Sequence, residues 1–491
     1  MKKNILKVFA MMTFGLGISS CGENFLETDY YKGIEAEGGL STVNNISTAL
    51  NGTYYNLFYY TFAGNYAINI GDIPTDISYW NSKTNHFNNI YTYTVVDTDT
   101  YLNDIWEYGY KVADNATRVI NGAQELYDGC TAEEKAQLDQ IMAEAYGLRG
   151  YAELMLVNIY AHQVKVNGTD FSSQPGIVVI DQKPIEALAE VTRSTVGESY
   201  TAILSDLNNA LTHFDAAGGD RGSILYFNKA AVYGLLARTN LYLENWNDAK
   251  KYAQMALDEK DITTLTYDAK AYAALYTGNE SNTESMLSLA ITQTDNWSAN
   301  SNGTLWSTYN YSPSPKLQAI YGTNDCRTSI FGWSEKSTPS VPIFTGGKLS
   351  QHSSGNSAYA TNYLVNAPEM YLIIAEANLK TGDLANASNA LLTVAKRNAD
   401  ITSVNDLPAT SDALMSFIKD ERARELFQEG HRLYDLRRWD EAADVFAIQA
   451  PNIAFTYTNY KISDLVFPIP SAEVNSGFGV EQNDWSGTLP K

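Results

Sequence analysis

Apolar residues recur every three or four positions along most of this 491-residue chain, which is the spacing of helices with one buried face. The helix that starts at residue 132 follows Thr131 and carries Glu133 and Glu134 in its first turn, where the helix dipole favours acids. The pattern predicts a mainly helical protein. The expected helices span residues 41–60, 103–127, 132–162, 196–216, 224–258, 365–398 and 411–447.

Residues 261–364 have a different composition from the rest of the chain. They are rich in Ser, Thr, Asn, Gly and Tyr, and they contain several prolines. This is the composition of loops and short strands, and the segment is too long to be a simple connection. We expect an irregular region here, and a second, mostly irregular stretch over residues 451–491.

Two stretches that lie 138 residues apart repeat one pattern. Residues 235–241 read LLARTNL and residues 373–379 read IIAEANL. In both, a helix is followed by a turn, at Glu244 or at Gly382, and then by a second helix. The unit resembles the tetratricopeptide helix hairpin, which buries its apolar face only against a neighbour. We expect these hairpins to serve as scaffold.

The first twenty residues read as an export signal. Three lysines among the first seven residues precede an apolar run over residues 8–18, which is too short to span a bilayer. Ile18-Ser19-Ser20-Cys21 then resembles a bacterial lipobox, whose cysteine is acylated and becomes the new N-terminus. We expect removal of residues 1–20, a lipid on Cys21, and a tether over residues 21–40.

Charge and composition exclude several classes of function. The chain has 34 Lys and Arg against 56 Asp and Glu, so its net charge is −22. That charge argues against nucleic acid as a partner and against purely electrostatic attachment to an anionic membrane. Three cysteines do not make a disulfide framework. The 34 tyrosines outnumber the 17 phenylalanines, which points to rings at wet surfaces such as binding sites for polar ligands.

After the lipobox, further motifs follow in order as far as residue 485. They are Asn24-Phe25-Leu26-Glu27, AEAYGLRGY at 143–151, NKAA at 228–231 with LAR at 236–238, YLIIAEA at 371–377, the ER, EL, EG, R and DLRRW series over 421–439, and PIP at 468–470 with QNDW at 482–485. Together they resemble the SusD/RagB family of outer-membrane glycan-binding lipoproteins. The chain departs from that pattern at Asp484, where the family has Pro, and it lacks an Arg ahead of Tyr371.

The resemblance implies an all-α, SusD-like fold in which tetratricopeptide-like helix hairpins support a long irregular ligand-binding region. We therefore expect an N-terminal helical region over 41–260, a ligand-binding insertion over 261–364, and a C-terminal helical region over 365–491. The resemblance also implies a lipid-anchored protein of the cell outer membrane that faces the exterior. Its expected partners are an oligosaccharide and a SusC-like TonB-dependent transporter, with no cofactor.

The densest charge cluster lies between Asp420 and Arg438. Its carboxylates could serve as an acid/base pair, but acids and arginines recur there three positions apart and would pair along a helix. A neighbouring arginine also lowers the pKa of a carboxylate, which is the wrong direction for a general acid. We expect a structural network. The five histidines lack the spacing of metal ligands, and no nucleophile motif is present.

Two expected loops combine flat rings with amides and carboxylates, which is the mixture that a sugar-binding surface needs. One covers residues 76–81 and the other residues 295–311. We expect them to form a shallow, exposed face, with Trp80, Trp297 and Trp306 as the leading platforms. The full set of candidate ligand-binding residues is Trp80, Asn81, Trp297, Trp306, Tyr309 and Tyr311.

Two classes of function remain. The first is a non-catalytic surface protein that captures an oligosaccharide and hands it to a transporter; a peptide is the alternative ligand. The second is a glycoside hydrolase that uses two carboxylates, whose spacing in sequence is not diagnostic. The resemblance over the whole chain favours the first.

Overall fold

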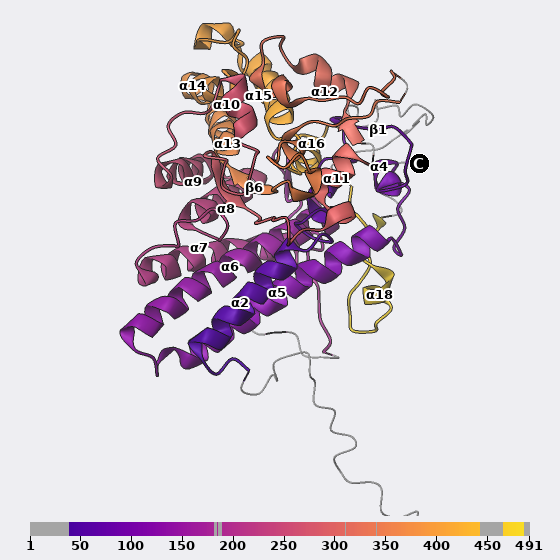
Figure 1. The fold of residues 1–491 in the computed structure, drawn as a ribbon. Helices are drawn as coiled ribbons and strands as arrows, with labels where there is room; N and C mark the ends of the chain where they lie inside the picture. Colours follow the sequence, from indigo (N-terminus) through magenta and orange to yellow (C-terminus); the bar gives the residue numbers. More distant parts are fainter. Residues whose placement is uncertain are drawn as a thin grey trace, which may run out of the picture.

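The computed structural model describes residues 39–180, 184, 189–309, 311–339, 341–441 and 465–485. Helices dominate this part of the chain, and its strands form three short two-stranded antiparallel sheets (Figure 1). The expected all-α fold is therefore confirmed. Cys21, the expected signal and most of the expected tether lie outside the described residues. No helix in the described ranges is long and apolar enough to cross a membrane.

Four long helices pack together as one layer (Figure 1). They are α2 (Val43–Phe58), α5 (Thr100–Tyr127), α6 (Ala132–Tyr160) and α7 (Val196–Ala217). Thr131 caps the start of α6 and shares a reciprocal pair of hydrogen bonds with Glu134, so the expected start of this helix is confirmed. Every side chain from Ile141 to Tyr160 is buried, or all but buried, so α6 lies at the centre of the layer.

The predicted repeat forms two helix hairpins that pack against each other. The first is α8 (Lys229–Tyr242) with α9 (Trp246–Glu259), and the second is α13 (Ala367–Lys380) with α14 (Leu384–Ala395). Glu244 and Gly382 occupy equivalent turn positions, and both have left-handed backbone, with φ of +55° and +83°. The two hairpins thus repeat the turn geometry as well as the helices, and α9 packs on α13.

The helix predicted over residues 411–447 is two helices. α15 (Ser411–Glu425) ends before a turn over residues 426–431, and α16 (Arg432–Trp439) follows it. Within the turn, Gly430 has φ of +80° and passes so close to Gly71 that a Cβ atom at Gly71 would lie 1.9 Å from the Gly430 carbonyl oxygen. The amide of Leu433 donates to the Gly71 carbonyl over 2.7 Å. This backbone crossing needs both glycines and bends the chain away from a continuous helix.

The irregular region is expected over 261–364, and the structure shows short elements there, joined by loops. They are α10 (Ala269–Ala274), β4 (Ser285–Ser288), α11 (Asn302–Ser307), β5 (Tyr311–Pro313), α12 (Pro315–Ile320) and the start of β6 (Tyr363–Asn366). β4 pairs with β6, and β5 pairs with β1 (Ser78–Trp80) from the N-terminal half. Figure 1 shows β1, α11 and α12 on one side of the helical body. The remaining short elements are α3 (Tyr66–Ile70), α4 (Asn88–Tyr91), β2 (Lys165–Val166), β3 (Thr169–Asp170) and α18 (Ser471–Val474).

Candidate functional site

The structure buries four of the six side chains that were expected to bind ligand. They are Trp80, Asn81, Trp306 and Tyr311. The indole N–H of Trp306 donates to Asn69 Oδ1 over 2.9 Å, and that of Trp80 donates to the Thr84 carbonyl over 2.9 Å. The exposed position expected for these rings is wrong, because each ring fills the core and its polar atom bonds inside the protein.

The two segments that carry these residues nevertheless come together. β1 pairs antiparallel with β5, so that Tyr79 lies opposite Ser312 and Trp80 opposite Tyr311. A groove of about 680 Å³ lies beside this pair of strands. Two aromatic residues, three polar residues, four prolines and Ala319 line it. The aromatic and polar residues are Tyr79, Trp333, Gln318, Ser337 and Thr338.

The alternation of side chains along a strand explains why Tyr79, and not Trp80, reaches the groove. Successive side chains of a strand point to opposite faces. Trp80 faces the core, where its ring lies 6.0 Å from that of Tyr91, whereas Tyr79 lines the groove with 9% of its surface exposed. Residues 76–81 were expected to form a loop, but residues 78–80 form the strand β1, and Tyr79, which was not a candidate, lines the groove in place of Trp80.

Trp333 lies on an arm, described over residues 331–339 and 341–345, that folds back on itself. Bridges join Trp333 to Phe344 and Thr338 to Val341, and the amide of Ser334 donates to the Ile343 carbonyl over 2.9 Å. The Trp333 ring packs against Phe344 with ring centres 5.2 Å apart, and 38% of the residue is exposed. Sequence reasoning missed Trp333, although a Trp between a Gly and a Ser, followed by two nearby prolines, was a usable signal for an exposed ring in a loop.

Asn81 holds this arm in place. Its side-chain amide donates to the Pro342 carbonyl over 2.6 Å, and its Oδ1 accepts from the Lys83 amide over 3.1 Å. Asn81 is 1% exposed. It therefore positions the groove and does not contact a ligand in this conformation.

Residues of α12 also line the groove, and Ser314 Oγ caps this helix by accepting from the Leu317 amide over 3.0 Å. The carboxylate of Asp76, which is buried and does not line the groove, binds Lys316 over 2.7 Å and Arg432 over 2.8 Å. Burial alone would raise the pKa of Asp76, but the charges of Arg432 and Lys316 outweigh it and hold that pKa below its ordinary value. Asp76 is thus a buried, fixed anion, unsuited to act as a general acid.

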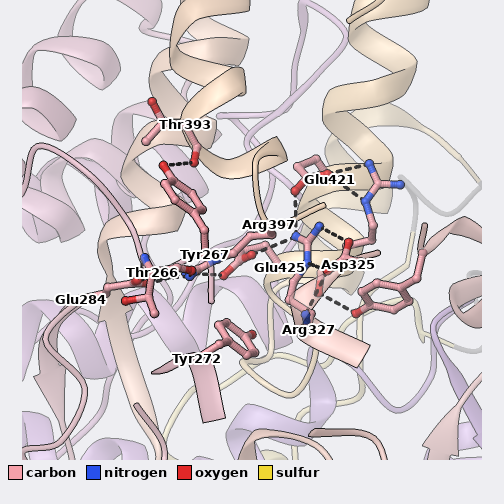
Figure 2. A network of polar contacts seen from close by, with 12 residues as sticks. Thr266, Tyr267, Tyr272, Glu284, Asp325, Arg327, Thr393, Arg397, Glu421 and Glu425 are labelled. Atoms are coloured by element: carbon pink, nitrogen blue, oxygen red, sulfur yellow. Dashed lines mark hydrogen bonds and ion pairs between the residues drawn. The ribbon is translucent and has the colours of Figure 1, made fainter. Parts of the chain in front are cut away.

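The carboxylates of the dense charge cluster are also held by buried arginines (Figure 2). Arg327 binds Glu421 and Glu425 through one nitrogen, over 2.7 and 2.9 Å, and Asp325 through another, over 2.7 Å. Arg397 links Glu425 to Glu284 on the other side. Despite burial, the charge of Arg327 keeps the pKa of Glu421 at about 2. This arrangement supports the structural reading of the cluster.

The pairs within the cluster differ from those that helical spacing predicted. The expected pair of Asp435 with Arg438 forms, with a distance of 2.9 Å. Arg422 binds Asp435 and not Glu425, however, and Glu429 and Arg432 take partners elsewhere in the chain. The turn between α15 and α16 explains why Glu429 and Arg432 do not pair, because Glu429 lies on no helix and cannot face Arg432 across a helical turn. Arg422 and Glu425 both lie on α15, but Glu425 is bound by Arg327 and Arg397 instead.

The other two candidates, Trp297 and Tyr309, are half-buried at the surface and do not line the groove. Tyr309 stacks on the exposed ring of His86, with ring centres 4.0 Å apart. Within the described ranges, no group of three or more His, Cys, Asp or Glu is placed to hold a metal ion. The groove is therefore the candidate site, and its lining side chains are uncharged.

Two family models together match almost the whole chain. The model described as the SusD family matches residues 244–485, and the model described as "Starch-binding associating with outer membrane" matches residues 25–243. A search of curated proteins finds no match.

Solved structures share the fold at low sequence identity. A SusD superfamily protein from Bacteroides thetaiotaomicron is 21% identical, with a TM-score of 0.77, over 90% of this chain and 99% of that one. A SusD superfamily protein from Bacteroides vulgatus is 21% identical, with a TM-score of 0.78, over 90% and 99%. A SusD-like carbohydrate binding protein from Bacteroides vulgatus is 20% identical, with a TM-score of 0.67, over 81% and 83%.

Proposed function

Because the chain belongs to the SusD/RagB family, we propose that it is a non-catalytic glycan-binding lipoprotein of the cell surface and that its ligand lies in the groove lined by Tyr79 and Trp333. The observation that carries this proposal is the exposed Trp333 ring in a groove whose lining side chains are all uncharged. Tyr79 and Trp333 join the proposed site in place of the buried Trp80, Trp306 and Tyr311.

The chemistry of the groove suits a sugar. A pyranose ring offers an apolar C–H face, which packs on a flat ring such as Trp333, and hydroxyls around its edge, which need hydrogen-bonding groups. Tyr79, Gln318, Ser337 and Thr338 supply such groups at the groove. Burial raises the pKa of Tyr79, so its hydroxyl stays protonated and can donate.

Charge narrows the class of glycan. The lining is uncharged and the whole chain has a net charge of −22, so the surrounding field repels anionic ligands. We therefore favour a neutral oligosaccharide over a uronate-rich or sulfated one. The descriptions of one matching family model as starch-binding and of one similar structure as carbohydrate binding support this choice.

The proposed location and partner rest on the sequence and the family. The resemblance of Ile18-Ser19-Ser20-Cys21 to a lipobox supports a lipid anchor on Cys21, and one family model carries the description "associating with outer membrane". The proposed role is to capture the oligosaccharide outside the cell and deliver it to a SusC-like TonB-dependent transporter. The hydrolase alternative is disfavoured, since none of the described residues that line the groove is a carboxylate and the buried Asp76 is bound by two cations.

The proposal is tested with the mature protein on native gels that contain soluble starch, dextran, galactomannan, arabinoxylan or pectin. We expect retardation by at least one neutral polysaccharide, and calorimetry with the matching oligosaccharide, maltoheptaose for starch, gives the affinity. Chromatography after long incubation should recover that oligosaccharide intact. Failure of every polysaccharide to retard the protein, or retention of peptides alone, would overturn glycan binding. Turnover that is lost on replacing one Asp or Glu would establish a hydrolase.

A further inference from the structure

A second aromatic surface surrounds Trp297, and none of its residues lines the groove. Three tyrosines come from the end of α2 and the turn after it, a fourth comes from α5, and Trp297 comes from the loop over residues 292–300. The ring of Trp297 lies 4.4 Å from that of Tyr59, 5.6 Å from that of Tyr60 and 5.8 Å from that of Tyr55. We call Tyr55, Tyr59, Tyr60, Tyr108 and Trp297 the Trp297 platform.

The rings of this platform are accessible. Tyr55 is 49% exposed, the most of any tyrosine or tryptophan in the described part of the chain, and the other four are half-buried. Their neighbours already fix their orientation. The indole N–H of Trp297 donates to the Phe58 carbonyl over 2.9 Å, and Tyr59 stacks on Tyr108 with ring centres 4.5 Å apart and planes within 11°.

The loop that carries Trp297 is held by its own hydrogen bonds. The amide of Asp295 donates to Thr292 Oγ1 over 2.9 Å, and the amide of Ser298 donates to Asn296 Oδ1 over 2.9 Å. The amide side chain of Asn65 also donates to the Asn300 carbonyl over 2.8 Å. A ligand would therefore meet a preformed surface, and binding would cost little ordering of the protein.

Charged groups border the platform. Asp295 is exposed on the Trp297 loop, and Glu107 and Lys111 on α5 form an exposed ion pair with a distance of 2.6 Å. The Lys111 ammonium lies 4.2 Å from the centre of the Tyr108 ring. Asp104 on the same helix is half-buried. Three carboxylates against one ammonium provide acceptors for hydroxyl groups and disfavour an anionic ligand.

Exposed, rigid rings edged by carboxylates and tyrosine hydroxyls meet the chemical needs of an uncharged sugar. We propose that the Trp297 platform is a second carbohydrate-binding site, which acts beside the groove on long neutral glycans. This inference rests on the proposed function for its class of ligand, but not for its site. Two sites on one protein would hold a polysaccharide more tightly than an oligosaccharide too short to reach both.

The test compares three variants: Tyr55→Ala at the platform, Trp333→Ala at the groove, and the double variant. The control is Tyr252→Ala, which removes a half-buried ring on α9 outside both sites. Among the described residues, the Tyr55 side chain is held only by contacts with neighbouring rings, so its loss should change the melting temperature little. On gels with the polysaccharides named above, we expect each single variant to lose about three- to tenfold in affinity and the double variant to lose all retardation. Tyr252→Ala should match wild type.

A second measurement locates the ligand independently of affinity. In protein labelled with 5-fluorotryptophan, the resonances of Trp297 and Trp333 are assigned by replacing each with Phe. Titration of the Trp333→Ala protein with maltoheptaose, or with the oligosaccharide of the polysaccharide that binds, should still shift the Trp297 resonance.

The outcomes separate the two proposals. If Tyr55→Ala binds like wild type and the Trp297 resonance does not move, the proposal of a second site is wrong, while the proposal of the groove as the binding site is unaffected. If Trp333→Ala has no effect while Tyr55→Ala abolishes binding, the platform is the main site and the groove is wrong. If wild type binds none of the polysaccharides, both proposals fail together.

Discussion

The side-chain amide of Asn81 donates to the backbone carbonyl of Pro342 over 2.6 Å, although 261 residues separate them. Asn81 directly follows β1, which carries Tyr79, and Pro342 belongs to the arm that carries Trp333. This one hydrogen bond therefore ties together the two segments whose aromatic rings line the groove.

Replacing Asn81 with Asp should weaken both ligand binding and the fold. Aspartate keeps the acceptor for the Lys83 amide but loses the donor and sets a charge against the Pro342 carbonyl. We expect the free energy of unfolding to fall by about 1–3 kcal/mol, as for a buried polar group left without a partner. Affinity for the identified oligosaccharide should fall at least tenfold, because the arm is released. Calorimetry and urea unfolding provide the two values, and unchanged affinity would show that the arm is held by other contacts.

Trp333 and Trp306 should respond in opposite ways to replacement by Ala. Trp333 is 38% exposed and lines the groove, so its loss should reduce affinity about three- to tenfold while the melting temperature changes little. Trp306 is fully buried and donates to Asn69, so its loss should cost about 3–5 kcal/mol of stability. Trp306→Ala protein that remains folded should bind normally. If Trp306→Ala lost affinity without losing stability while Trp333→Ala lost stability alone, Trp306 would belong to the binding site.

Arg327 should be among the most costly side chains to remove. It is 2% exposed and faces the carboxylates of Asp325, Glu421 and Glu425 (Figure 2). Arg327→Met leaves these buried charges without their shared counter-ion, and we expect a loss of about 3–5 kcal/mol in urea unfolding. Arg118→Met, which breaks an exposed pair with Asp114, is the control and should cost less than about 1 kcal/mol. Equal losses in the two variants would contradict a structural role for the buried network.

Acid should destabilise the protein below about pH 4.5. Glu376 and Glu421 have pKa values near 2 in the fold, against an ordinary 4.5, because buried arginines outweigh the effect of burial. A lowered pKa means that their contribution is complete above about pH 4.5 and is lost as the pH falls toward 2, on the order of 3 kcal/mol for each group.

Asp72 has the opposite effect on the pH dependence of stability, because its pKa is raised and not lowered. Burial raises its pKa to about 6, so its contribution to stability grows as the pH falls from about 6 to about 4. Urea unfolding at pH 7, 5, 4 and 3 should therefore show a decline that begins only below about pH 4.5. Glu376→Gln should be less stable at pH 7 and lose less between pH 5 and 3. A midpoint that does not change between pH 5 and 3 would show that these carboxylates are not held as ion pairs.

Cys21 should carry the lipid anchor. Cys21→Ala removes the acylation site at the end of the lipobox, so the protein should move from the membrane pellet to a soluble fraction or remain unprocessed. Fractionation and the mass of the N-terminal peptide measure both outcomes. A Cys21→Ala protein that is still processed and firmly membrane-bound would refute the assignment.

Local spacing determined the parts of the fold that the sequence predicted well. The start of α6 at Thr131 and the paired hairpins with equivalent turns at Glu244 and Gly382 depend on residues within a few positions of one another. Helical periodicity and capping are set by such short separations, so they can be read along the chain. The same reasoning recognised the charge cluster as structural, although it paired several of its members wrongly.

The site depended on contacts that sequence spacing does not encode. The sequence predicted that residues 76–81 and 295–311 lie together as loops, but only the pairing of β1 with β5 and the packing around them decided that Tyr79 faces the groove while Trp80 and Trp306 fill the core. Trp333 reaches the groove because its arm is tied to Asn81 across 261 residues. In irregular segments, no period marks the buried face, so what packs against each ring from elsewhere in the chain decides whether it is core or binding surface.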